Sequence, residues 1–191
     1  SKAASDGNDK VTISGNVNVE SLDVDLGQGD NDLIFHATVT SLGVATISSG
    51  SGRDQVTQND KFVAQSIDMK LGDGNNTVIF NAPVTSDDIL DITTGSGEDE
   101  VITNDTATLD ADNMTFTLGD GKNTVTFNEN VTALGKFELN TGTGVDKLTT
   151  AKDAILKVTD EEGNGEIILT LGDGENTVTF NDVVTAGSGF D

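Results

Sequence analysis

Apolar and polar residues alternate along most of this chain. In 114–118 every second residue is apolar, and in 177–180 Val178 and Phe180 alternate with two threonines. A period of two is that of a β-strand with one buried face. No segment needs a helix to explain its pattern, so the sequence predicts an all-β protein.

Four segments of the chain are nearly copies of one another. They are LGQGDNDLIFH from Leu26, LGDGNNTVIFN from Leu71, LGDGKNTVTFN from Leu118 and LGDGENTVTFN from Leu171. A second type alternates with them: DGNDKVTIS from Asp6, SGSGRDQVTQN from Ser49, TGSGEDEVITN from Thr94 and TGTGVDKLTTA from Thr141. Both types reduce to Gly-x-Gly-x-Asp/Asn-x-Val/Leu, here called the glycine motif. Self-similarity at a regular period indicates stacked structural repeats.

The spacing of the glycine motif sets the size of the repeat. Its Asp/Asn position recurs at steps of 22, 23, 22, 23, 24, 23 and 30 residues. We predict a single parallel β-helix, or β-solenoid, over 1–191, with about eight coils of 22–23 residues and three short strands in each. The long step reflects a polar loop insertion near 159–166. A further glycine motif begins in 186–191, so we expect the chain to be a fragment of a larger repeat protein.

A wider coil of about 45 residues, with one motif of each type, is the competing geometry. Against it, an Asn recurs five residues after the Asp/Asn position in both motif types, as amides stacked at about 4.8 Å would require. These residues are Asn59, Asn81, Asn104, Asn128 and Asn181. Large and small side chains also alternate at one inward position, namely Phe35, Gln58, Phe80, Thr103, Phe127, Thr150 and Phe180. Both patterns favour coils of 22–23 residues.

The composition restricts the partners. Asp and Glu total 33 against 10 Lys and Arg, for a formal net charge of -23 at pH 7. Nucleic-acid binding and docking on an anionic membrane need basic patches, so we expect cations as charge partners. No apolar run approaches the roughly 20 residues of a membrane span, so we expect no membrane insertion. The absence of cysteine excludes disulfides and thiolate chemistry.

The glycine motif resembles the haemolysin-type, or RTX, nonapeptide of secreted bacterial proteins, Gly-Gly-x-Gly-x-Asp-x-Leu-x. The matching stretches are 71–79, 94–102 and 141–149, each without the first glycine. The resemblance implies that glycine carbonyls and an acidic side chain hold calcium between stacked turns. Carried over by position, the ligands would be Asp9, Asp54, Asp99 and Asp146, with Asn31, Asn76, Asn123 and Asn176 as weaker carbonyl donors.

The resemblance covers only part of each coil. RTX nonapeptides run end to end, whereas here the motif occurs once per 22–23 residues, and half of its key positions are Asn. The same residues equally predict a calcium-free Asx turn, in which the side chain bonds its own backbone two residues on. Structural turns and calcium sites both remain open from the sequence.

A row of Thr and Ile is predicted on the outer face of the solenoid. Its members are Thr12, Ile34, Thr57, Ile79, Ile102, Thr126, Thr149 and Thr179. The row resembles the ice-binding faces of β-solenoid antifreeze proteins, and a ligand-binding module for ice or glycan is the alternative function. The neighbouring outward row mixes Lys, Asp, Glu, Gln and Thr, which breaks a regular lattice. Thr and Ile are also ordinary strand residues.

The supply of catalytic groups is small. The only histidine, His36, takes the position of the Asn row, and the only arginine, Arg53, takes a variable position of the glycine motif. Most acidic residues are explained by their place in the repeat, and those of 160–166 belong to the polar insertion. Active sites on parallel β-helices need residues that break the repeat and converge in a cleft. We therefore expect no enzyme.

These observations lead to a functional expectation. We expect a non-enzymatic structural repeat domain of an extracellular or cell-surface protein: a rigid spacer, an adhesin stalk, or a surface-layer or matrix component. Calcium would screen the acidic charge and stabilise the turns. An open solenoid end exposes strand edges, so self-association or pairing with neighbouring repeats of a longer chain is also expected.

Overall fold

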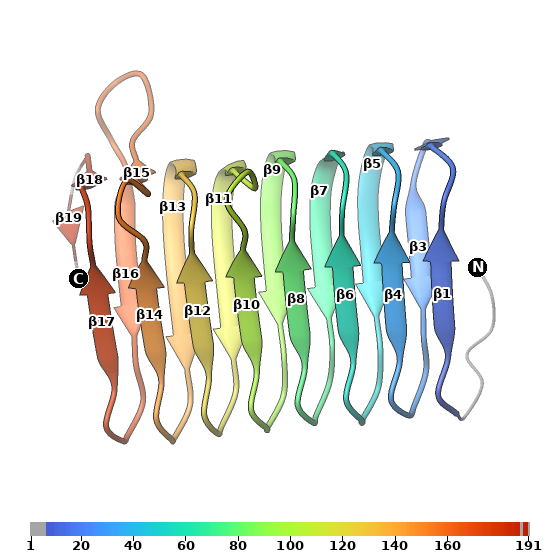
Figure 1. Ribbon diagram of the computed structural model, residues 1–191. Coiled ribbons are helices and arrows are strands. Elements are labelled where there is room, and N and C mark those ends of the chain that lie inside the picture. The colour runs from blue at the N-terminus through green and yellow to red at the C-terminus, as the bar shows by residue number, and fades with distance from the viewer. Residues whose placement is uncertain (1–6, 188, 191) are drawn as a thin grey trace.

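The computed structural model describes residues 7–187 and 189–190. Within these ranges the chain has strands, turns and bends but no helix, and it forms about six full turns of a parallel β-solenoid with short strands. Figure 1 shows the coils side by side in chain order. The predicted all-β solenoid is confirmed. Asp6, which opens the shortened motif, and Asp191 lie outside the described residues.

One sheet takes a four-residue strand from each repeat. Its eight strands are β1 (Lys10–Ile13), β4 (Asp32–Phe35), β6 (Gln55–Gln58), β8 (Thr77–Phe80), β10 (Glu100–Thr103), β12 (Thr124–Phe127), β14 (Lys147–Thr150) and β17 (Thr177–Phe180). All neighbours are parallel, and no register shift occurs between β1 and β17. The eight expected repeats are therefore present as eight strands, although the full turns number about six.

The second sheet has strands of 9 to 11 residues in its centre and shorter strands at both ends. Its members are β2 (Val17–Val19), β3 (Leu22–Asp25), β5 (Val39–Ser48), β7 (Phe62–Lys70), β9 (Val84–Thr93), β11 (Leu109–Leu118), β13 (Val131–Thr141), β15 (Leu156–Val158), β16 (Glu166–Thr170), β18 (Val184–Ala186) and β19 (Gly189–Phe190). Both β2 and β3 pair with β5, and both β15 and β16 pair with β13.

The prediction of three short strands per coil is wrong for the central coils. There the second and third strands merge into one strand, and a bulge shifts its register midway, for example between Ala64 and Ser66. The bulge holds one residue in β7, Gln65, but two in β9, Asp87 and Asp88. Because a bulge bends a strand, the merged strand turns a corner of the coil at the bulge and stays within the same sheet.

The core is a narrow column of side chains between the two sheets. The inward position of the first sheet pairs Phe35 with Gln58 and Gln58 with Phe80, and the same exchange of large and small side chains continues to β17. Phe127 also contacts Phe116 and Phe137, with ring centroids 5.8 and 5.9 Å apart. The predicted interleaving is confirmed, and it fills the core at each level without Trp or Tyr.

The predicted asparagine ladder is confirmed in half of its length. Asn81 donates from Nδ2 to Asn59 Oδ1 at 2.8 Å, Asn104 donates to Asn81 Oδ1 at 2.5 Å, and Asn59 contacts His36 Nδ1 at 3.3 Å. Asn128 instead donates to the backbone carbonyl of Thr103 at 2.7 Å. Asn181 bonds Thr150 in the same way.

The polar segment 159–165 lies as a loop between β15 and β16. Its Asp160 accepts the backbone N–H groups of Glu162 and Asn164 at 2.9 and 2.7 Å. In the neighbouring coil the same place holds only a two-residue bulge between Ala133 and Lys136. The loop is therefore an enlarged corner, and Figure 1 shows it projecting from the edge opposite the glycine motifs.

Candidate functional site

The glycine motifs form tight turns that stack along one edge of the solenoid (Figure 1). Each turn joins a strand of the second sheet to the next strand of the first sheet. Gly74 shows why glycine is required: its φ is 123°, and a Cβ would lie 1.8 Å from the carbonyl oxygen of Gly52 in the coil below. Backbone cannot move away from such a contact, so the turns stack only with glycine at this position.

The eight candidate ligands lie in one row, as predicted, and hydrogen bonds connect them from coil to coil. The Asn31 N–H donates to Asp54 Oδ1 at 3.1 Å, and the Asp54 N–H donates to Asn76 Oδ1 at 3.1 Å. The same backbone-to-side-chain bonds at 2.9–3.3 Å link Asp9 to Asn31, Asn76 to Asp99, Asp99 to Asn123, Asn123 to Asp146 and Asp146 to Asn176. We call this row the Asp/Asn ladder.

Asparagine suits its positions in the ladder because its amide has donors as well as an acceptor. Asn76 Nδ2 lies 3.1 Å from the carbonyl oxygen of Gly72 and 3.3 Å from that of Gly74, both in its own turn. Asn123 likewise donates to its own turn. These glycine carbonyls correspond to those that face calcium in the RTX arrangement. Here they accept N–H groups.

The aspartate side of the ladder has a different hydrogen bond, seen at Asp99. Thr94 Oγ1, five residues before Asp99, donates to Asp99 Oδ2 at 2.8 Å. Every fully described motif with Asp at the ladder position has Ser or Thr at this place, and every motif with Asn there has Leu. The hydroxyl is thus present only where a carboxylate needs a second donor. This coupling explains why the two motif types differ.

Two aspartates keep a buried oxygen that lacks a partner. Among the described residues, Asp54 Oδ2 and Asp146 Oδ2 have no hydrogen bond, and neither do the hydroxyls of Ser49 and Thr141 that stand five residues before them. Both carboxyl groups are at most 1% exposed. Because Thr94 and Asp99 form the bond at the same spacing, the serine or threonine hydroxyl is the natural second donor to each buried oxygen.

The pKa values of a buried and an exposed carboxylate in the turns are shifted in opposite directions. Burial raises the pKa of Asp99 above its ordinary value, against the opposing effect of hydrogen bonds from Asn76 and Thr94. Asp73, exposed between the two glycines of its motif, has a lowered pKa because the backbone N–H and hydroxyl of Ser96 in the next coil both donate to it. Asp120 has the same relation to Thr143.

The spacing of the ladder carboxylates bears on whether calcium fits these turns. Buried Oδ2 atoms favour a cation, but Asp54, Asp99 and Asp146 each have Asn as their ladder neighbour on both sides. Successive carboxylates are therefore two coils, or about 10 Å, apart, whereas calcium takes six to eight oxygens at about 2.3–2.6 Å. No group of three acidic or histidine side chains with metal-binding geometry occurs among the described residues. The geometry favours a hydrogen-bonded ladder over an ion cage, and calcium binding stays a prediction.

The alternative of an Asx turn needs one correction. The Oδ1 atoms of Asp54, Asn76 and Asp99 accept a backbone N–H from the neighbouring coil, not from their own backbone two positions on. Sequence reasoning found the row but missed the hydroxyl coupling and the second row of bonds, which Asp73 and Asp120 accept. The signal for the second row was present, since Asp73 and Asp120 alternate with Ser or Thr in neighbouring motifs. The signal for the coupling was the pairing of Ser or Thr with Asp and of Leu with Asn.

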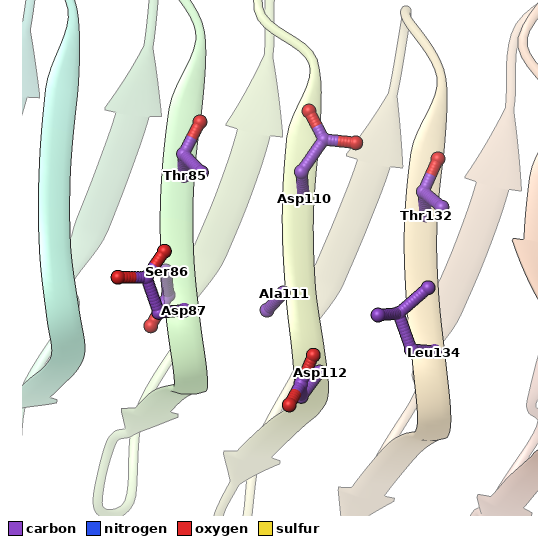
Figure 2. A pocket seen from close by; sticks show the side chains of 8 residues that line it. All are labelled: Thr85, Ser86, Asp87, Asp110, Ala111, Asp112, Thr132 and Leu134. Carbon is purple, nitrogen blue, oxygen red and sulfur yellow. The ribbon is translucent and has the colours of Figure 1, made fainter. Parts of the chain in front are cut away.

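A hollow lies elsewhere, on the outer side of the second sheet. It has a volume of about 260 Å³, and Figure 2 shows side chains from β9, β11 and β13 around it. Its lining consists of Thr85, Ser86, Asp87, Asp110, Ala111, Asp112, Thr132 and Leu134. Carboxylates and hydroxyls thus stand beside a single large apolar side chain at the bulged corner.

Comparisons with protein-family models, with curated proteins and with solved structures found no match to this chain. Among the described residues, no helix has the length and apolar character needed to cross a membrane. The fold is therefore assigned from the coordinates alone, as a parallel β-solenoid, and the likeness to RTX repeats remains one of local sequence.

Proposed function

We propose that this chain is a non-enzymatic, rigid structural repeat domain of an extracellular or cell-surface protein, acting as a spacer, stalk or matrix element. The observation that carries the proposal is the unbroken register of the first sheet, in which eight strands from eight repeats pair without a shift. A spacer needs its successive units to keep a fixed geometry, and this register supports that property.

Three kinds of contact hold neighbouring coils together. Backbone hydrogen bonds link both sheets, the Asp/Asn ladder links the turns, and the apolar column links the interior. Bending the solenoid would open all three on one side at once. In repeat architectures of this kind, each unit contacts mainly its neighbours, so length can change by whole units without a new fold.

The distance between the ends tests the spacer proposal. Thr12 and Thr179 belong to the same outward row, and seven steps between coils place their Cα atoms about 34 Å apart. Cysteines at these two positions can carry spin labels without interference, because the chain has no other cysteine. Double electron-electron resonance at high dilution should give one narrow distance distribution.

Deleting whole coils makes the test sharper. Removal of 54–98 takes out one Asp-type and one Asn-type coil, and should shorten the distance by about 10 Å while leaving it narrow. Removal of 54–75 alone would place Asn31 beside Asn76 and Phe35 beside Phe80, so this control should lose stability through overpacking. A broad distribution in the parent chain, or in the two-coil deletion, would contradict a rigid spacer.

Ligand binding by the outer face is the second candidate. The Thr and Ile row is in register across all eight strands, which favours a regular surface for ice or glycan. The adjacent row has Lys10, Asp32 and Glu100 among its members, and these charges interrupt the surface. Inhibition of ice recrystallisation at micromolar protein, lost on Thr126→Lys, would support this candidate over the spacer.

A further inference from the structure

The outer face of the first sheet carries almost no net charge. In each repeat, the residue before the ladder position and the first, third and fifth residues after it point outward, because the residues between them are buried or half-buried on the inner side. Over the eight repeats these positions hold four cations and five anions, a net charge of -1, whereas the whole chain has -23. A second copy of this acidic chain can therefore approach this face without strong repulsion. The cations are Lys10, Arg53, Lys122 and Lys147, and the anions are Asp30, Asp32, Glu98, Glu100 and Glu175.

The residues directly before the ladder position form a row whose charges recur every third repeat. Asp30, Glu98 and Glu175 stand three repeats apart, and Arg53 and Lys122 each follow an anion in the next repeat. When this row is reversed about the repeat of β8, Arg53 comes opposite Glu98, and Asp30 comes opposite Lys122. The row is therefore complementary to its own reversed copy, as a two-fold interface between identical chains requires. The uncharged members of the row are Asn8, Asn75 and Val145.

A hollow on the same face lies among these charged residues. It has a volume of about 330 Å³, and its lining includes Arg53, Glu98, Glu100 and Lys122. Within the described part of the chain, neither Arg53 nor Lys122 forms an ion pair with a carboxylate. A guanidinium group can bind a carboxylate through two parallel hydrogen bonds. The hollow thus offers two exposed carboxylates to an arginine, and Arg53 is the chain's only arginine.

We propose that two copies of this chain pack face to face through their first sheets, around a two-fold axis that runs along β8 between the sheets. Arg53 of each copy then enters the hollow of the other and lies opposite Glu98, while Asp30 lies opposite Lys122. The symmetry produces each pair twice. This inference extends the proposed structural role, but the two can fail separately, because a rigid monomer needs no lateral contact.

The other outward rows are compatible with this axis. Thr77 and Ile79 lie on it and face their own counterparts, so uncharged side chains occupy the centre. Lys147 comes opposite Lys10, which already pairs with Asp32 at 3.8 Å. Seven coils at about 4.8 Å and seven residues of each coil at about 3.3 Å give a face of roughly 680 Å² per copy. Two such faces bury about 1,400 Å², within the range of specific interfaces.

Exchanging the two charges of one pair tests the proposal. Sedimentation velocity at physiological ionic strength should show dimers of the parent chain, since the screening length of about 8 Å weakens the long-range repulsion more than contact pairs. Arg53→Glu and Glu98→Arg should each weaken dimerisation at least tenfold. The double variant Arg53→Glu/Glu98→Arg should restore it to within about threefold of the parent, because it rebuilds both pairs with opposite polarity.

A charge change on the other sheet is the matched control. Lys157→Glu, on an exposed residue of β15, changes the net charge as much as Arg53→Glu does. It should leave dimerisation within about threefold of the parent, and circular dichroism should show that every variant is folded. Three results would overturn the proposal: a parent chain that stays monomeric at millimolar concentration, equal weakening by Arg53→Glu and Lys157→Glu, or a double variant no better than its single variants.

Crosslinking locates the axis independently. Thr77 of one copy faces Thr77 of the other across sheets about 10 Å apart, so Thr77→Cys chains should be joined by a short bismaleimide. Thr124 is in the same outward row but two repeats from the axis. Its two copies would be about 19 Å apart along the solenoid, and Thr124→Cys chains should not be joined. Equal crosslinking of both variants, or crosslinking of Thr124→Cys alone, would contradict an axis along β8.

Discussion

Replacing Asn76 by aspartate tests why Asp and Asn alternate in the ladder. The change places carboxylates in three successive coils, at 54, 76 and 99, about 4.8 Å apart. It also removes the donors that now bond the carbonyl oxygens of Gly72 and Gly74. Asn76 is 1% exposed, so water cannot replace these bonds.

The magnitude follows from two terms. Losing two neutral hydrogen bonds costs about 1–2 kcal/mol. A carboxylate at 4.8 Å repels its neighbour by roughly 3.5 kcal/mol at an effective dielectric constant of 20. Repulsion from two such neighbours exceeds the cost of protonating the new aspartate, so its neutral form is favoured. Protonation costs about 4 kcal/mol at pH 7 for a group with an ordinary pKa of 3.9. The sum is about 5–6 kcal/mol, a large part of a typical domain's stability.

The matched control is Asp99→Asn, which removes a charge from the same ladder. Its amide oxygen can still accept the Asn76 N–H, so we expect a loss of about 1 kcal/mol or less. Urea unfolding followed by circular dichroism measures both variants. The cost of Asn76→Asp should fall by about 2.7 kcal/mol between pH 7 and pH 5, since the proton becomes easier to bind.

Two results would refute this reasoning. One is equal, pH-independent destabilisation by Asn76→Asp and Asp99→Asn. The other is a gain of stability by Asn76→Asp in millimolar calcium beyond that of the parent chain, because an added carboxylate ligand would strengthen an ion site.

Three further predictions concern the same turns. Gly74→Ala should cost several kcal/mol or abolish folding in thermal melts, because its Cβ would lie 1.8 Å from a backbone oxygen. The control Gly15→Ala, with no atom within 4 Å of its Cβ, should change stability by less than about 1 kcal/mol. Thr94→Val should cost about 1–3 kcal/mol at pH 7 and raise the pKa of Asp99 further, as NMR titration can show. In the parent chain the same titration should give Asp99 a pKa above, and Asp73 a pKa below, the ordinary value of an aspartate. The contribution of Asp99 to folding stability is then lost as pH rises through its pKa in the folded state. The contribution of Asp73 is lost as pH falls through its pKa in the folded state.

The fold could be predicted because the same pattern of inward residues recurs in every coil. The inward residues recur once per coil, so Phe35, Gln58 and Phe80 can be aligned from the sequence alone, and their pairing is confirmed. A solenoid has few other ways to bury such rows, since each coil contacts only its neighbours.

The corner of the coil could not be predicted, because a bulge has no residue type of its own. The steps of 22 and 23 residues differ by the one residue that distinguishes the bulge of β7 from that of β9. The step of 24 includes two extra residues, Asp105 and Thr106, in the turn before β11. Both changes lie outside the strands of the first sheet, whose register they leave intact. A length count alone does not say where in the coil a residue was added.

The ladder was located from sequence, but its chemistry was not. Spacing placed Asn76 and Asp99 in one row and left open whether they hold calcium or bond the backbone. The direction of each bond depends on which atom faces the next coil, and only coordinates show that Asp99 accepts from both Asn76 and Thr94. The matching of hydroxyl to Asp and of Leu to Asn was visible in the sequence, yet it acquires a meaning only with that contact.

Thermal unfolding by circular dichroism, in excess EDTA and then in millimolar calcium with magnesium as control, tests the central claim most directly. If the Asp/Asn ladder holds the coils together by hydrogen bonds, the chain should show a β-rich spectrum in EDTA, and calcium should change its melting temperature no more than magnesium does. A β-rich spectrum that forms only with calcium, or a large calcium-specific rise in melting temperature, would contradict the ladder and make Asp54, Asp99 and Asp146 metal ligands.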